Sequence, residues 1–255
     1  MTDPAAHRFP GRDGVDLAYR ELGGGRPLVL LHGFTADGTQ WIRSGHATAL
    51  AGQGYRVVLP DLRGHGHSAR PHDPACYPPD VMADDGLALI EWLGLGDYDL
   101  GGYSWGARTV LRMLVRGARP ARAIAGGQGL DAVTRASSPH GGYRRVLTAM
   151  ADGEPLEPGS PEAAQASWIT RLGGDPKALL RVLDTHVPTP ETALARITTP
   201  VLVAVGDRDR GQSSAGALAA TLPNARFTRV PGDHYTAFAG PEFASAITAF
   251  LGPAS

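Results

Sequence analysis

The chain has 255 residues, of which 42% are hydrophobic and 19% are charged, so it can bury a sizeable core and is too apolar to be intrinsically disordered. Its formal net charge of −1 lacks the excess of cations typical of proteins that bind nucleic acid or anionic membrane surfaces, and we expect neither partner. No apolar run approaches the roughly 20 residues that cross a bilayer, so membrane insertion is not expected.

Two features of the sequence predict a cytoplasmic location. The single cysteine, Cys76, excludes an intrachain disulfide, and we interpret it as an inert thiol because no partner motif surrounds it. The first residues show no basic segment followed by an apolar one, so no signal peptide is expected.

Short apolar runs alternate with helix-like stretches along most of the chain, which is typical of a parallel α/β sheet. Residues 15–22 alternate more between apolar and polar side chains, as an antiparallel edge strand would. Further strands, most of them expected to be buried on both faces, are predicted at 28–31, 57–59, 98–102, 121–125, 201–205 and 227–230. Helices are predicted around 41–52, 80–93, 104–116, 213–221 and 241–251.

One region breaks this alternation. Between about residues 131 and 190 no strand pattern appears, and helix-like pieces lie near 143–150, 161–171 and 176–183. A structureless loop of that length is improbable in a compact domain, so we predict a small helical insertion over the sheet. The chain would then be a single domain with a core formed by 1–130 and 191–255. A second domain that folds by itself is the alternative, which the small number of large apolar side chains disfavours.

The strongest local motif is Gly102-Tyr103-Ser104-Trp105-Gly106, which lies between a predicted strand and a predicted helix. Glycines on both sides of a serine are needed where the turn is so tight that a Cβ would clash. Such a turn exposes the Ser104 hydroxyl at a helix N-terminus, where the macrodipole favours developing negative charge. An ordinary Gly-rich turn is the alternative, but the strand–turn–helix context favours Ser104 as a nucleophile.

A serine hydroxyl needs a base to take its proton and a carboxylate to orient that base. Asp209 follows the predicted strand 201–205, and His234 follows the last predicted strand. Ligands of open α/β sheets gather at the carboxyl ends of the strands, so Ser104, Asp209 and His234 can converge there. Asp131 competes as the acid because it follows the sixth strand, but we favour Asp209 and interpret Asp131 as a helix cap.

The segment His32-Gly33-Phe34 follows an early strand and fits the place of an oxyanion loop. The backbone N–H groups of Phe34 and Trp105 would together donate to an oxyanion. Gly33 allows the main chain to approach closely. We interpret His32 as a residue that shapes the loop by hydrogen bonding.

The Gly-rich segment 61–68 contains two histidines near an acid, which suggests a metal site at first. Its spacing matches no familiar zinc site, however, and we expect no metal. We predict a structural turn in which Asp61 pairs with Arg63.

Five motifs in this order make the chain resemble the α/β-hydrolase superfamily over nearly its whole length outside the insertion. They are 28–34, 61–68, 102–106, Gly206 to Asp209 and Gly232 to His234. The resemblance implies an eight-stranded, mostly parallel sheet flanked by helices, a lid inserted after the sixth strand, and no cofactor.

The resemblance also implies roles for single residues. Ser104 would be the nucleophile, His234 the base and Asp209 the acid that orients it, since Asp209 stands three residues after Gly206. The backbone of Phe34 and Trp105 would form the oxyanion hole. A serine at the nucleophile position argues against the dehalogenase and epoxide-hydrolase branches, which attack with Asp.

The resulting hypothesis is a serine hydrolase that cleaves a small carboxylic ester or lactone. Alternatives with the same triad are a thioesterase, a carbon–carbon bond hydrolase, a cofactor-free perhydrolase similar to haloperoxidases, and a non-enzymatic small-molecule receptor. We expect the side chains of Phe34, Trp105, Tyr143 and Trp168 to form apolar walls that contact the substrate. The alternative is that they only pack the insertion onto the sheet.

Overall fold

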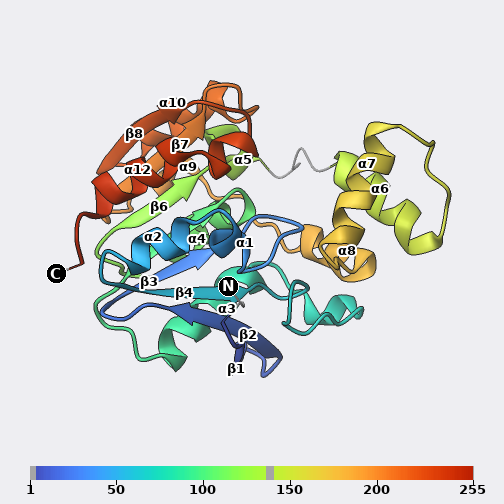
Figure 1. Ribbon diagram of the computed structural model, residues 1–255, viewed down its shortest axis with the longest axis horizontal. Coiled ribbons are helices and arrows are strands. Elements are labelled where there is room, and N and C mark those ends of the chain that lie inside the picture. The colour runs from blue at the N-terminus through green and yellow to red at the C-terminus, as the bar shows by residue number, and fades with distance from the viewer. Residues whose placement is uncertain (1–3, 136–140, 255) are drawn as a thin grey trace.

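The computed structural model describes residues 4–135 and 141–254, and an eight-stranded sheet forms its centre (Figure 1). The strand order is β1-β2-β4-β3-β5-β6-β7-β8, with antiparallel pairing of β2 to both β1 and β4 and parallel pairing across the rest. This confirms the predicted mostly parallel sheet. The bounds are β1 (His7–Pro10), β2 (Asp16–Leu22), β3 (Arg26–Leu31), β4 (Tyr55–Asp61), β5 (Asp99–Tyr103), β6 (Ala123–Gly126), β7 (Val201–Gly206) and β8 (Ala225–Val230).

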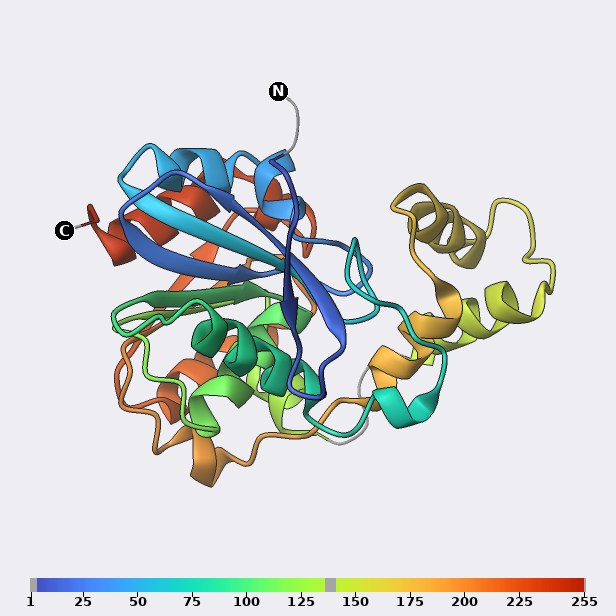
Figure 2. The ribbon, with the colours of Figure 1, turned by 90° about the horizontal axis from the view of Figure 1, so that it is seen from below.

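Helices cover both faces of the sheet because the central strands are apolar on both faces (Figure 2). Alternate residues of a strand point to opposite faces, and in β3 Leu28 and Leu30 pack into one core cluster while Val29 and Leu31 pack into the other. The first cluster includes residues of α1 (Gln40–Arg43), α2 (His46–Ala51), α11 (Thr236–Ala239) and α12 (Pro241–Leu251). The second includes residues of α3 (Val81–Trp92), α4 (Trp105–Val115) and α10 (Gln212–Thr221).

Among the described residues, five helices lie between β6 and β7, and the helical insertion predicted from the sequence falls within this stretch. They are α5 (Leu130–Thr134), α6 (Gly141–Asp152), α7 (Pro161–Arg171), α8 (Pro176–Asp184) and α9 (Glu191–Leu194). Residues 136–140 of the predicted insertion lie outside the described residues. The caps explain where α7 and α8 begin: the side chains of Ser160 and Asp175 accept hydrogen bonds from the first backbone N–H groups, and a proline follows each.

The part of the insertion formed by α6, α7 and α8 projects beyond the edge of the sheet where the parallel strands end (Figures 1 and 2). Hydrogen bonds connect it to the segment that follows β4. That segment contains the short helix η1 (Pro74–Cys76). Arg70 donates to the Gly173 carbonyl over 2.8 Å, and His72 contacts the Asp175 carboxylate over 2.8 Å. These polar contacts place α8 next to the segment after β4.

No helix among the described residues combines the length and the apolar character needed to cross a membrane.

Two glycines lie where backbone segments pack most closely behind the turn at Ser104. A Cβ on Gly102 would lie 2.4 Å from the backbone of Gly106, and a Cβ on Gly106 would lie 2.3 Å from the Leu31 carbonyl oxygen. Real Cβ atoms do not come so close to backbone, so any side chain here would push α4 away from β3. The glycines of the motif are therefore required by packing.

We expect Gly106→Ala to lower the free energy of unfolding by about 1–3 kcal/mol or more, because the added methyl overpacks a rigid backbone contact. Gly24→Ala is the matched control, since a Cβ there meets nothing within 4 Å, and its effect should stay within about 0.5 kcal/mol. The free energy of unfolding of both variants is measured by urea unfolding, with tryptophan fluorescence as the signal. Equal stability of the two variants would contradict the close approach.

Candidate active site

Ser104 stands in the turn between β5 and α4 with φ of 56° and ψ of −113°. A positive φ is uncommon for a residue with a side chain, and such strain persists only where the surroundings hold the backbone in place. Here the Ser104 N–H donates to the Gly126 carbonyl over 2.8 Å, and Gly102 and Gly106 allow the close packing. The turn presents the Ser104 hydroxyl at the start of α4.

The side chains of Ser104, His234 and Asp209 form one hydrogen-bonded chain. His234 Nε2 lies 2.9 Å from Ser104 Oγ, and His234 Nδ1 lies 2.7 Å from Asp209 Oδ2. A carboxylate only accepts, so Nδ1 carries the proton and Nε2 is left to accept from the serine hydroxyl. Asp209 is buried and also accepts from the Gly211 N–H over 2.9 Å, which holds its carboxylate in place.

The loops that carry the acid and the base come from neighbouring strands. Asp209 follows β7 and His234 follows β8, and these strands are parallel, so both loops emerge at the same edge of the sheet. Tyr103 donates its hydroxyl proton to the His234 carbonyl over 2.7 Å. Burial raises the pKa of Tyr103, so its hydroxyl stays protonated and can donate. Sequence analysis did not assign this contact to Tyr103, although the residue lies inside the serine motif.

The competing acid, Asp131, lies elsewhere. Its side chain is exposed at the start of α5 and pairs with Arg135 over 3.1 Å. The structure therefore brings Asp209, and not Asp131, to the imidazole of His234.

The loop between β3 and α1 passes next to Ser104. A Cβ on Gly33 would touch the Ser104 Cβ at 3.5 Å, so the main chain here lies within van der Waals distance of the serine. Gln40 accepts from the Gly33 N–H over 2.9 Å. His32 donates from Nδ1 to the Gly33 carbonyl and accepts at Nε2 from the Leu62 N–H. His32 thus shapes this loop and has no free nitrogen for catalysis.

Aromatic rings surround the serine turn. The Phe34 ring lies 5.6 Å from Trp105 and 5.0 Å from Tyr143 of α6, edge to face in the second case. The Tyr143 hydroxyl lies 3.1 Å from the hydroxyl of Tyr235, which directly follows His234. The insertion therefore contacts both the loop of Phe34 and the loop of His234. Sequence analysis missed Tyr235, and its position beside His234 was the only available signal.

Trp168 lies farther along the insertion, on α7. The residue is 43% exposed, and its ring packs against the Arg171 guanidinium at 5.4 Å. The suggestion that Trp168 contacts substrate stays a prediction.

Comparisons with known proteins agree with the fold. Residues 26–126 match the family model described as "alpha/beta hydrolase fold". A thermophilic esterase from Thermogutta terrifontis superimposes with a TM-score of 0.77, at 27% identity, over 97% of this chain and 98% of that chain. The chain has the α/β-hydrolase fold.

The relatives carry different activities in their names. The chain is 29% identical to a putative non-heme chloroperoxidase of Synechocystis sp., over 86% of this chain and 87% of that protein. It is 38% identical to the non-heme chloroperoxidase CPO-A1 of Kitasatospora aureofaciens, but over 41% of this chain and 37% of that protein. It is 35% identical to an epoxide hydrolase of Caballeronia sordidicola, over 37% of this chain and 28% of that protein.

Histidines outside the triad include three that are buried and neutral. Burial lowers the pKa of His32, His46 and His65, that of His65 to about 3. His65 donates from Nδ1 to the Arg63 carbonyl over 3.0 Å, and its ring packs edge-on against His32. Within the described residues no group of three or more His, Cys, Asp or Glu could hold a metal ion.

These histidines predict how stability depends on pH. Their pKa in the folded chain lies below the value of 6.5 expected when it unfolds, so the unfolded chain binds more protons. The free energy of unfolding should therefore be fully retained above pH 6.5 and should fall as the pH drops below it. The contribution of His65 to this fall should continue down to about pH 3.

We expect His65→Phe to reduce the slope of unfolding free energy against pH between about pH 4 and 6, by up to about 1.4 kcal/mol per pH unit. The phenyl ring keeps the planar packing but takes up no proton. Urea unfolding at a series of pH values measures the slope, and a slope equal to that of the wild type would contradict the burial argument.

Proposed function

We propose that the chain is a serine hydrolase that cleaves a small, largely apolar carboxylic ester or lactone through an acyl-enzyme. The observation that carries this proposal is the hydrogen-bonded chain from Ser104 through His234 to Asp209, next to the loop that carries Phe34. The esterase that superimposes over nearly the whole chain supports the same reaction class.

In the first half of the reaction, Ser104 Oγ attacks the carbonyl carbon of the ester while His234 Nε2 takes the hydroxyl proton. The electron pair of the C=O bond moves to the carbonyl oxygen, where the backbone N–H groups of Phe34 and Trp105 donate to it. When the tetrahedral intermediate collapses, the bond to the alcohol oxygen breaks. The alcohol leaves with the proton from His234, and an ester of Ser104 remains.

In the second half, water gives a proton to His234 and attacks the acyl-enzyme. Collapse releases the carboxylic acid and returns the proton to Ser104. Asp209 keeps the proton of the imidazole on Nδ1 and stabilises its charged form. None of these steps involves a metal or a cofactor.

Substrate recognition is assigned to the rings around the serine. Phe34, Trp105 and Tyr143 supply apolar surface, and Trp168 adds to it from α7 when the substrate reaches that far. The insertion of about residues 131–190 serves as a lid on a single domain, and the contact between Tyr143 and Phe34 supports this role. The partner is a small molecule in the cytoplasm.

The chloroperoxidase relative favours a second candidate function, perhydrolysis. Hydrogen peroxide would replace water in the second half, so that the acyl-enzyme yields a peracid and free Ser104. Iodide oxidation during turnover of an acetate ester with peroxide would detect the peracid. Thioester and vinylogous diketone substrates in the same panel test the remaining alternatives, a thioesterase and a carbon–carbon bond hydrolase.

The reaction class predicts that a fluorophosphonate labels the wild type at Ser104. We expect Ser104→Ala to lose both the label and ester turnover, since the attacking oxygen is gone. Mass spectrometry locates the label, and a p-nitrophenyl ester series measures turnover. Labelling at another serine or undiminished turnover would contradict the proposal, and a labelled wild type that turns over no tested substrate would favour the receptor alternative.

If Asp209 is the acid that orients His234, two Asp→Asn substitutions should have unequal effects on turnover. Asp209→Asn should lower kcat by a factor on the order of 10⁴, because the imidazole loses its correct tautomer. Asp131→Asn is the matched control, since Asp131 is exposed and pairs with Arg135, and most activity should remain. Steady-state kinetics on the same ester compares them, and the reverse ranking would reassign the acid.

A further inference from the structure

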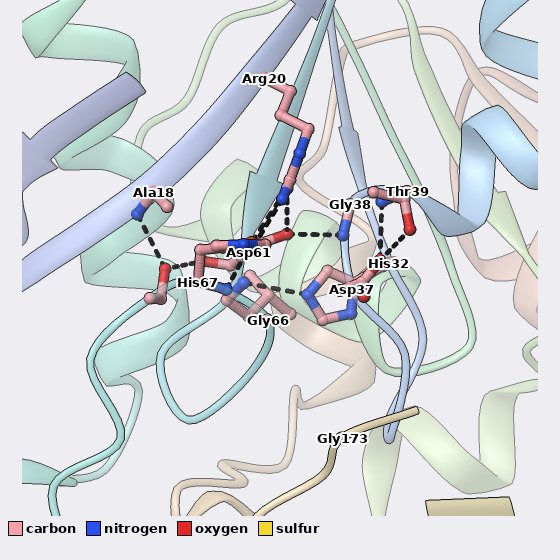
Figure 3. Close-up of polar contacts among 12 residues, drawn as sticks. Ala18, Arg20, His32, Asp37, Gly38, Thr39, Asp61, Gly66, His67 and Gly173 are labelled. Carbon is pink, nitrogen blue, oxygen red and sulfur yellow. Dashed lines mark hydrogen bonds and ion pairs between the residues drawn. The ribbon is translucent and has the colours of Figure 1, made fainter. Parts of the chain in front are cut away.

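A buried carboxylate stands between the loop that carries Phe34 and the loop that follows β4 (Figure 3). Asp61, the last residue of β4, is 1% exposed. Its Oδ1 accepts from the Gly38 N–H over 2.8 Å, and its Oδ2 accepts from the His67 N–H over 2.8 Å. Arg20 of β2 donates from Nη1 to both oxygens, at 3.1 and 3.0 Å. The pair predicted between Asp61 and Arg63 is therefore wrong.

Asp61 and its neighbour Leu62 hold the Phe34 loop at both ends. Asp61 binds the N–H of Gly38 at the far end, and the Leu62 N–H donates to His32 Nε2 at the near end over 2.9 Å. The segment 32–38 is thus clamped by two consecutive residues. The close contact at Gly38 leaves too little space for a side chain, because a Cβ there would lie 3.1 Å from Asp61 Oδ1 and 2.7 Å from the Leu59 carbonyl oxygen.

The clamped segment contains strained backbone. Thr35, which directly follows Phe34, is buried and has a φ of 67°. A β-branched residue is a genuine outlier in this region, and it stays there only when surrounding contacts over-determine the backbone. The two contacts from residues 61 and 62, together with the Gln40 bond to Gly33, are such constraints.

The charge of Asp61 suits this task. Bonds from N–H groups to a carboxylate are stronger and shorter than those to a neutral acceptor, and Arg20 compensates the buried charge. Arg20 Nη2 also lies 2.6 Å from His67 Nδ1. Because a guanidinium only donates, that nitrogen of His67 accepts and carries no proton in this arrangement.

We propose that Asp61, balanced by Arg20, is a positioning residue that holds the Phe34 N–H in the place from which it donates to the oxyanion. The proposal rests on the ester hydrolysis proposed above. Asp61 acts through the backbone of Gly38 and has no part in proton transfer.

The same loop offers a matched control. Arg63 is also fully buried and donates to both oxygens of Asp85, each over 2.9 Å. Its other side-chain bonds go to Asp13 and the Cys76 carbonyl. These contacts lie away from the segment 32–38, so Asp85→Asn disturbs a buried ion pair of the same loop without touching the Phe34 loop.

Two measurements on Asp61→Asn and Asp85→Asn test the proposal. The first is amide hydrogen exchange of peptides that cover residues 32–38, which needs no activity. We expect Asp61→Asn to accelerate exchange in this segment at least about tenfold, because it loses one charged acceptor and places an amide against its donors. Asp85→Asn should leave exchange in this segment as in the wild type.

The second measurement is the ratio of kcat/KM for an ester to that for its thionoester. Sulfur accepts hydrogen bonds weakly, so the ester gains more from a well-placed donor and the ratio reports the oxyanion hole. Loss of one donor costs about 10²–10³ in kcat, so we expect the ratio to fall at least about tenfold in Asp61→Asn and to stay unchanged in Asp85→Asn.

The proposal would be overturned if Asp61→Asn and Asp85→Asn showed the same hydrogen exchange in residues 32–38 and the same ester-to-thionoester ratio of kcat/KM. If Asp61→Asn fails to fold, Arg20→Lys replaces it, because lysine keeps the charge but cannot bind both oxygens in the same geometry, and a smaller shift in the same direction is expected. If the wild type hydrolyses no ester, the proposed function fails, while hydrogen exchange still decides whether Asp61 holds the loop.

Discussion

Direct backbone contact between the first turn of α4 and the end of β3 sets the geometry of the whole site. Gly106 lies so close to the Leu31 carbonyl that no side chain fits between them. The serine turn therefore lies against Gly33, and Ser104 and the loop of Phe34 are neighbours. Stabilisation of an oxyanion needs such preorganisation, because dipoles that are already in place cost no rearrangement during the reaction.

The base and its acid approach the same point from the other half of the sheet. Because β5, β7 and β8 run parallel, the residues that follow them emerge at one edge, and short loops are enough to bring Asp209 and His234 to Ser104. The hydroxyl of Tyr103 then binds the His234 carbonyl, so the nucleophile strand also holds the loop of the base. The proposed acid–base relay thus depends on ordinary features of a parallel sheet.

Two buried ion pairs, one at the last residue of β4 and one in the loop that follows, serve different parts of the molecule. Arg63 binds Asp85 of α3, whereas Asp61 binds Arg20 and the Phe34 loop. Charges lose their hydration when they are buried, so such a pair is weak evidence for stability by itself. At Asp61 the pair contributes direction, since a carboxylate that accepts four hydrogen bonds from three donors defines where each donor lies. The proposed positioning role follows from this directionality.

The sequence by itself determined the features that depend on local chemistry. Continuous apolar runs identified the central strands, helix-like stretches indicated α7 and α8, and the glycines at 102 and 106 marked a turn in which only glycine fits. The strand β1 escaped prediction because its four residues carry no alternation or apolar run. The order of Ser104, Asp209 and His234 was readable because each follows a strand.

The tertiary structure alone decided which charged and aromatic side chains meet. Asp61 lies two residues from Arg63 in sequence, yet it pairs with Arg20, which is 41 positions away on an antiparallel strand. Asp209 rather than Asp131 reaches the imidazole because β8 pairs with β7, and Tyr143 reaches the Phe34 loop from α6 of the insertion. Local patterns constrain backbone conformation, but the partner of a long polar or aromatic side chain depends on which strands become neighbours, and that is settled only when the chain packs.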